Sequence, residues 1–220
     1  FIENITLTSN LLKISENHGS KKIVFGSSVY VYSGTEERPF SENSSLLPEE
    51  FLGASKLSSE LLLKAYSLSA KVDVFSLRLF TVYGHGSREN QFIPEVLRKF
   101  TTPNIEANFG NPEVTRDFIY IKDVVKIMTK SMLSLNTKKN CEVFNLGTGK
   151  SVSINYLFQI IKKITDSKPK VIKKKLDPFD PKKSYGKFIK ISKFLKLKKY
   201  KYTKLEEGLK QTIEYLNLRN

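Results

Sequence analysis

The chain has 220 residues, of which 40% are hydrophobic and 11% aromatic. This composition is typical of a folded globular protein and excludes a disordered chain. The single cysteine, Cys141, excludes an internal disulfide and a cysteine-based metal cluster, and we expect no bound metal. No stretch approaches the roughly 20 apolar residues of a membrane-spanning helix, and the N-terminal residues lack the pattern of a signal peptide. We therefore expect a cytoplasmic protein that does not enter a membrane.

The net charge of +15 is concentrated in one segment. Residues 162–204 hold 17 lysines and only three aspartates. Lysines that alternate with aromatic residues, as in residues 196–202, can bind phosphate backbones and stack on bases. A lysine-rich solvated surface is the alternative. The chain has only six arginines, and lysine lacks the planar donor fork of arginine, so the composition favours the solvated surface.

The predicted elements alternate between strands and helices. Short apolar runs predict strands, and apolar residues at helical spacing predict helices. In chain order we expect a helix over 4–16, a strand over 22–28, a helix over 48–70, a strand over 72–80, a helix over 93–100, an extended segment over 117–120, a helix over 124–135, a strand over 142–147, and helices over 154–164 and 205–216. This alternation indicates an α/β fold with a parallel sheet.

Five segments carry recognisable motifs: residues 4–12, 23–32, 48–60, 78–84 and 116–124, with looser matches at 144–149 and 205–209. In this order they resemble the later two thirds of an extended short-chain dehydrogenase/reductase, of the NAD-dependent epimerase/dehydratase group that acts on nucleotide sugars. The resemblance implies a partial Rossmann-like parallel sheet flanked by helices, with a smaller C-terminal α/β portion that binds substrate. Residues 1–84 would belong to the Rossmann-like domain and residues 85–220 mostly to the substrate-binding portion, with strand 142–147 returning to the Rossmann-like sheet.

The resemblance also implies roles for individual residues. Ser28 and Lys56 would be catalytic, and Lys56 and Phe80 would contact the cofactor. Substrate-binding positions would be Thr81, Gln91, Phe92, Phe109 and Arg116, with Tyr32 close by. Each has a plainer alternative: a serine in a turn, an exposed helical lysine, a core aromatic residue, or an arginine in a structural ion pair with Asp117 and Lys122. Because parallel strands end at the same edge of a sheet, we expect Ser28, Lys56, Phe80 and Arg116 around one cleft.

Two features depart from the family pattern. The family carries a tyrosine four positions before the lysine, on the same helical face, and this chain has Leu52 there. Leucine cannot exchange a proton, and Tyr30 and Tyr32 lie on another element. The chain also holds no Gly-x-x-Gly-x-x-Gly turn for a cofactor pyrophosphate and does not begin with Met. We therefore expect a truncated protein of impaired activity, in a family that uses NAD or NADP.

The sequence thus predicts a nucleotide-sugar epimerase/dehydratase-family protein whose ligand is a nucleotide sugar. The alternatives are a non-catalytic relative that binds RNA or regulates a partner through the lysine-rich segment, and a decaying gene fragment. Helices 4–16 and 48–70 resemble a pair that forms a homodimer interface in the family, although their apolar faces could be intramolecular core. A sheet without its first strands would leave one edge unpaired.

Overall fold

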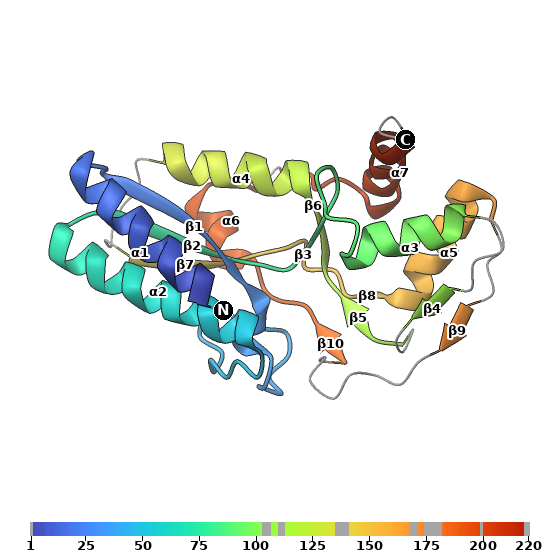
Figure 1. The fold of residues 1–220 in the computed structure, drawn as a ribbon, viewed down its shortest axis with the longest axis horizontal. Helices are drawn as coiled ribbons and strands as arrows, with labels where there is room; N and C mark the ends of the chain where they lie inside the picture. The colour runs from blue at the N-terminus through green and yellow to red at the C-terminus, as the bar shows by residue number, and fades with distance from the viewer. Residues whose placement is uncertain are drawn as a thin grey trace.

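A three-stranded parallel sheet forms one end of the protein (Figure 1). The computed structural model describes residues 2–102, 107–109, 113–134, 141–167, 171–173, 182–198 and 200–217. The strand order is β1 (Lys22–Ser28), β2 (Asp73–Leu79) and β7 (Cys141–Leu146), all parallel. In the described residues β1 pairs only with β2, so it is an edge strand. The predicted α/β fold with a parallel sheet flanked by helices is confirmed.

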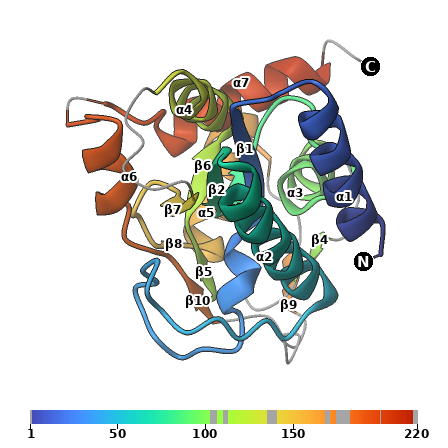
Figure 2. The same cartoon turned by 90° about the vertical axis from the view of Figure 1, so that its left-hand side faces the viewer.

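Helices cover both faces of this sheet (Figures 1 and 2). Helices α1 (Ile2–Asn17) and α2 (Phe51–Ala70) lie on one side, and α4 (Ile121–Leu133) and α6 (Ile189–Phe194) lie on the other. The alternation of side chains along β2 divides its residues between the two faces. Val74 packs with Leu63 of α2, whereas Phe75 packs in the cluster that contains residues of α4 and α6.

Small polar residues form the contact between α1 and α2, which run parallel. Asn4 Nδ2 donates to Ser55 Oγ and Thr8 Oγ1 donates to Ser59 Oγ, both at 2.9 Å. The large apolar residues of the two helices lie mostly outside this contact. Exposed ones include Leu7, Leu11, Ile14, Leu61, Leu62 and Leu68.

The other end of the protein is a second layer of helices and short strands. Helices α3 (Phe92–Thr101), α5 (Ile154–Thr165) and α7 (Leu205–Asn217) contribute to one apolar cluster. The strands are β3 (Thr81–Tyr83) paired with β6 (Phe118–Tyr120), β4 (Ala107–Phe109) paired with β9 (Val171–Lys173), and a three-stranded sheet in the order β10 (Lys183–Ser184), β5 (Thr115–Arg116), β8 (Val152–Ser153). No helix in the described residues is long and apolar enough to cross a membrane.

Candidate active site

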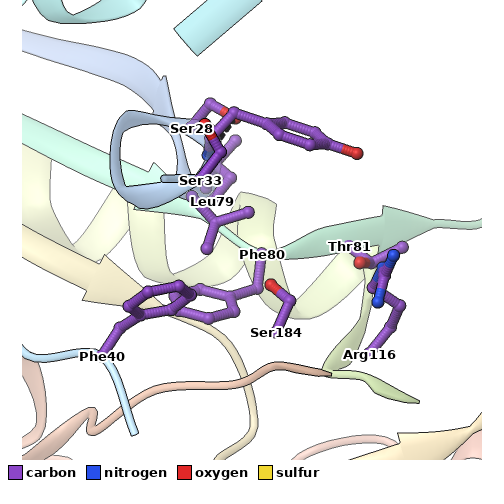
Figure 3. Close-up of a pocket in the computed structure, with 10 residues that line it drawn as sticks. Ser28, Ser33, Phe40, Leu79, Phe80, Thr81, Arg116 and Ser184 are labelled. Carbon is purple, nitrogen blue, oxygen red and sulfur yellow. Dashed lines mark hydrogen bonds between the residues drawn. The ribbon is translucent and has the colours of Figure 1, made fainter. Parts of the chain in front are cut away.

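A pocket lies where the sheet meets the second layer (Figure 3). It encloses about 490 Å³, counting space that is open to solvent. Its lining comes from distant parts of the chain: Ser28, Val29, Tyr30, Ser33, Phe40, Leu79, Phe80, Thr81, Arg116 and Ser184. The pocket therefore brings together four residues predicted from the sequence, namely Ser28, Phe80, Thr81 and Arg116.

Ser28 is the last residue of β1 and lies opposite Leu79, the last residue of β2, in the parallel ladder. Its backbone is extended, and the 3₁₀ helix η1 (Val29–Tyr32) begins directly after it. The Ser28 hydroxyl accepts a hydrogen bond from the Tyr30 backbone N–H at 3.2 Å. Because this contact uses only a lone pair, the serine O–H can still donate to a ligand in the pocket.

Aromatic rings form one side of the pocket. Phe80 follows β2 and is only 4% exposed. Its ring lies 5.1 Å from the ring of Phe188, edge to face, and 6.4 Å from the ring of Phe40. Phe80 thus packs in the apolar core and also lines the pocket. A core position therefore does not exclude a contact with a ligand.

Arg116 and Thr81 lie on two short strands at the opposite side of Ser184 from Phe40 (Figure 3). Arg116 is 9% exposed, and its Nη1 donates to the carbonyl of Thr115 at 2.8 Å. The neighbouring Asp117 carboxylate accepts three hydrogen bonds from Thr148 and Gly149. Asp117 therefore holds the turn after β7, and burial raises the pKa of its carboxyl despite these donors.

Lys56 is not among the residues that line this pocket. Its ammonium donates to the carbonyl of Gly26 at 2.8 Å and lies 4.9 Å from the centre of the Phe25 ring. It thus reaches β1 two residues before Ser28. Burial lowers the pKa of Lys56, and it forms no ion pair with any described residue. The side chain retains donors that could bind hydroxyl groups, such as those of a ribose.

A model of the NAD dependent epimerase/dehydratase family matches residues 1–147 of the chain. The chain belongs to this family. The UDP-glucuronate 4-epimerase of Thermodesulfobacterium geofontis is 31% identical over 214 residues, which are 96% of this chain and 64% of that protein. The chain spans less than two thirds of the length of curated relatives that it matches.

Two solved structures have the same fold. The UDP-N-acetylglucosamine 4-epimerase from Methanobrevibacter ruminantium, in complex with UDP-N-acetylmuramic acid, superposes with a TM-score of 0.86 at 31% identity, over 99% of this chain and 69% of that one. MoeE5, in complex with UDP-glucuronic acid and NAD, superposes with a TM-score of 0.88 at 28% identity, over 99% of this chain and 72% of that one.

The start of α2 is fixed against the residues that follow β1. A Cβ on Gly53 would lie 2.3 Å from the carbonyl oxygen of Tyr30, so only glycine allows this close approach. Leu52, where the sequence resemblance leads us to expect a tyrosine, is 43% exposed and offers no proton. Lys56 is one turn further along the same face of α2. The helical face that carries Lys56 therefore has no phenol at position 52.

A buried polar network lies beneath the pocket. Arg78 of β2 donates to both carboxylate oxygens of Glu60 in α2, at 3.0 and 2.7 Å. The hydroxyl of Tyr32 accepts from Arg78 and donates to Asn145 of β7, and Ser27 donates to Glu60. Burial raises the pKa of Tyr32 to about 12. Tyr32 is thus a structural hydrogen-bond donor and is unsuited to exchange protons at neutral pH.

The other predicted substrate residues lie away from the pocket. Gln91 directly precedes α3, and its side-chain oxygen accepts from the Arg88 backbone N–H. Phe92 begins α3 and packs against the apolar cluster of the second layer. Phe109 belongs to β4, paired with β9. Among the described residues, no three His, Cys, Asp or Glu side chains are grouped so that they could hold a metal ion.

Sequence reasoning missed six pocket residues: Val29, Tyr30, Ser33, Phe40, Leu79 and Ser184. Phe40 reaches the pocket because its segment bridges to Gly186 and its backbone bonds to Tyr185 and Lys187. Ser184 arrives through the pairing of β10 with β5. Both depend on contacts between residues far apart in the chain, and no local pattern around either residue indicates them.

Proposed function

We propose that the chain binds a nucleotide sugar in this pocket and acts as the substrate side of an NAD- or NADP-dependent epimerase/dehydratase. The observation that carries the proposal is the convergence of Ser28, Thr81 and Arg116 on one pocket at the carboxyl ends of two parallel strands. Hydroxyls suit a sugar and a guanidinium suits a diphosphate. The UDP-sugars named with the relatives above support this ligand class.

Each residue would have a distinct task. The free O–H of Ser28 would donate to the reacting sugar oxygen and stabilise charge that develops there. Thr81 would hydrogen-bond the sugar ring, and Phe80 would provide a flat apolar wall. Arg116 would hold the diphosphate, because its charge is permanent and its donors are planar. The deep burial of Arg116 strengthens such a contact.

The chain's own residues fit only the nicotinamide-ribose end of a dinucleotide. Lys56 would bind the ribose hydroxyls and Phe80 would lie beside the nicotinamide. A bound NAD or NADP would accept a hydride from the sugar and return it. Phosphate binding would need a glycine-rich turn that the 220 residues do not contain.

Turnover should be slow, because residue 52 is a leucine and carries no group that can exchange a proton with the sugar. In this proposal Ser28 and Lys56 position and polarise the sugar and cofactor hydroxyls, while the phenol that would carry the proton is replaced by the Leu52 side chain. Binding of the nucleotide sugar does not depend on that phenol. The proposal therefore separates binding, which we expect to be retained, from catalysis, which we expect to be impaired.

The test is calorimetric titration with UDP-glucuronic acid. Arg116→Ala should weaken binding by roughly 2 to 4 kcal/mol, because the substitution leaves the diphosphate charge without its partner. Arg98→Ala, at an exposed arginine of α3, is the matched control and should bind like the natural chain. Equal affinity of the Arg116 and Arg98 variants would refute the proposed diphosphate site.

RNA binding through the lysine-rich segment is the second candidate, and the packing of its aromatic residues counts against it. Tyr200 donates to Asp123 and packs edge to face with Tyr202, and both contact the core cluster beneath α4. Burial raises the pKa of Tyr202 to about 12. These rings are therefore poorly placed to stack on bases. Residues 168–170, 174–181 and 199 of this segment lie outside the described residues.

The same titrations separate the two candidates. RNA binding should fall steeply with salt and should depend on exposed lysines such as Lys193, Lys198 and Lys201. Nucleotide-sugar binding should depend on Arg116 and hardly on those lysines, because charges beyond about 10 Å are screened at 0.1 M salt. Tight, lysine-dependent RNA binding without any nucleotide-sugar binding would overturn our choice.

A further inference from the structure

Arg38 lies in the segment between η1 and α2, and its guanidinium donates to three backbone carbonyls. Its Nε donates to the carbonyl of Lys183 at 2.6 Å. Its Nη1 donates to the carbonyls of Thr35 at 2.5 Å and Glu37 at 2.7 Å. These contacts leave Nη2, which makes no hydrogen bond within the part of the chain that the structure describes. An arginine held this firmly presents its remaining donors in a fixed direction.

The guanidinium of Arg38 lies beside the pocket. It stacks on the ring of Phe40, with 3.9 Å between its central carbon and the ring centre, and Phe40 lines the pocket. Its carbonyl partner Lys183 pairs with Thr115 in the β10–β5 ladder. Thr115 in turn is the residue whose carbonyl accepts from Nη1 of Arg116. Arg38 and Arg116 thus donate to the carbonyls of Lys183 and Thr115, which are paired in two adjacent strands.

The guanidinium of Arg38 lies in a partly buried place without a paired carboxylate among the described residues. Burial lowers the pKa of Arg38, Tyr185 and Glu36 act in the opposite direction, and the positive charge of Arg116 makes a smaller lowering contribution. No carboxylate in the described residues forms an ion pair with Arg38. Two neighbouring guanidiniums in a partly buried place are stabilised by an anion that carries more than one charge.

We propose that Arg38 is a second diphosphate-binding residue that acts together with Arg116, so that each guanidinium binds one phosphoryl group. This inference rests on the proposed nucleotide-sugar function and deepens it. A diphosphate can contact both guanidiniums, whereas a monophosphate can satisfy only one. The pair would therefore select nucleoside diphosphates over monophosphates, and it would do so independently of the base and the sugar.

The experiment compares Arg38→Met with Arg98→Met by calorimetric titration with UDP, UMP and inorganic pyrophosphate. Methionine keeps an unbranched apolar stem over the Phe40 ring and removes the charge. Arg38→Met should weaken UDP and pyrophosphate binding by about tenfold or more, weaken UMP much less, and reduce the salt dependence of UDP binding. Arg98→Met, at the exposed control position, should change none of these.

A structural role for Arg38 gives a different pattern. If the arginine only holds its segment in place, Arg38→Met will weaken UDP and UMP equally and leave the salt dependence unchanged, and the inference is overturned. Melting of each variant without ligand identifies loss of folding, and Arg38→Lys, which keeps a charge, should then recover part of the UDP affinity.

The remaining outcomes separate this inference from the proposed function. UDP binding that depends on Arg116 but not on Arg38 overturns the inference and leaves the function in place. Pyrophosphate binding that depends on both arginines, without binding of UDP-glucuronic acid, supports the anion site and refutes the nucleotide-sugar function. If the natural chain binds neither UDP nor pyrophosphate, both fail.

Discussion

Leu52 is the residue at which we expect the proposed site to lack a proton-exchanging group. The Leu52→Tyr substitution would restore a phenol one helical turn before Lys56, on the same face of α2. Because Leu52 is 43% exposed, the larger ring can be accommodated without disturbing the core. In a form of the protein that binds NAD, we expect nucleotide-sugar turnover to rise by about 10² to 10⁴, the usual contribution of general acid-base catalysis.

Leu52→Phe is the matched control for this experiment, because it adds the same ring without the hydroxyl. Steady-state kinetics with UDP-glucuronic acid should show the gain in the tyrosine variant alone. An equal rate in both variants, with NAD bound and the fold intact, would mean that the pocket has been adapted to binding only.

Single residues of the site differ in how far the sequence could predict them. Ser28, Thr81 and Arg116 stand in motifs that resemble those of the family, so the resemblance already implied a site role for them. Phe40 and Ser184 reach it only through pairing between distant segments. Such pairing depends on the folded arrangement and leaves no periodic signal in the sequence.

At the scale of elements, the buried ion pair ties α2 to β2. Glu60 and Arg78 are 6% and 3% exposed. Glu60→Gln keeps the shape of the side chain but leaves the Arg78 charge buried without compensation. We expect the free energy of unfolding to fall by roughly 3 to 5 kcal/mol, as is usual when one partner of a buried pair is removed. Urea denaturation followed by circular dichroism measures this loss.

Glu206→Gln is the control for the ion pair. Glu206 approaches Lys210 and Lys163 at 3.4 and 3.8 Å, and all three side chains are substantially exposed. Its substitution should cost less than about 1 kcal/mol, because water screens exposed pairs. A similar small loss for Glu60→Gln would show that the network beneath the pocket contributes little to holding α2 on the sheet.

The long elements follow from local patterns, whereas the short strands do not. Apolar spacing predicts the bounds of helices such as α5 and α7, and of strands β1, β2 and β7, to within three residues. Strands β5, β8 and β10 have two residues each, which is too short for any period to be detected. Apolar spacing also predicted helix α1, but it did not predict which face of the helix is buried. The buried residues of α1 are the polar Thr8 and Ser15.

At the scale of the whole molecule, α1 and α2 leave apolar surface uncovered. Leu7, Leu11 and Ile14 follow a spacing of four and three residues, so they share one face of α1, and they are 66%, 38% and 56% exposed. On α2, Leu61 and Leu68 are 60% and 64% exposed. Apolar faces of this kind on neighbouring helices are typical of an interface between protein molecules.

We expect this surface to join two copies of the chain through α1 and α2. A charge at Leu7 and Leu61 should separate them, because two buried carboxylates would lose their hydration without gaining partners. Sedimentation velocity should show a dimer for the natural chain and a monomer for the Leu7→Glu/Leu61→Glu variant. Leu133→Glu, at a position of α4 that is 73% exposed, is the control and should remain dimeric. A natural chain that stays monomeric, or a double variant that stays dimeric, would exclude this interface.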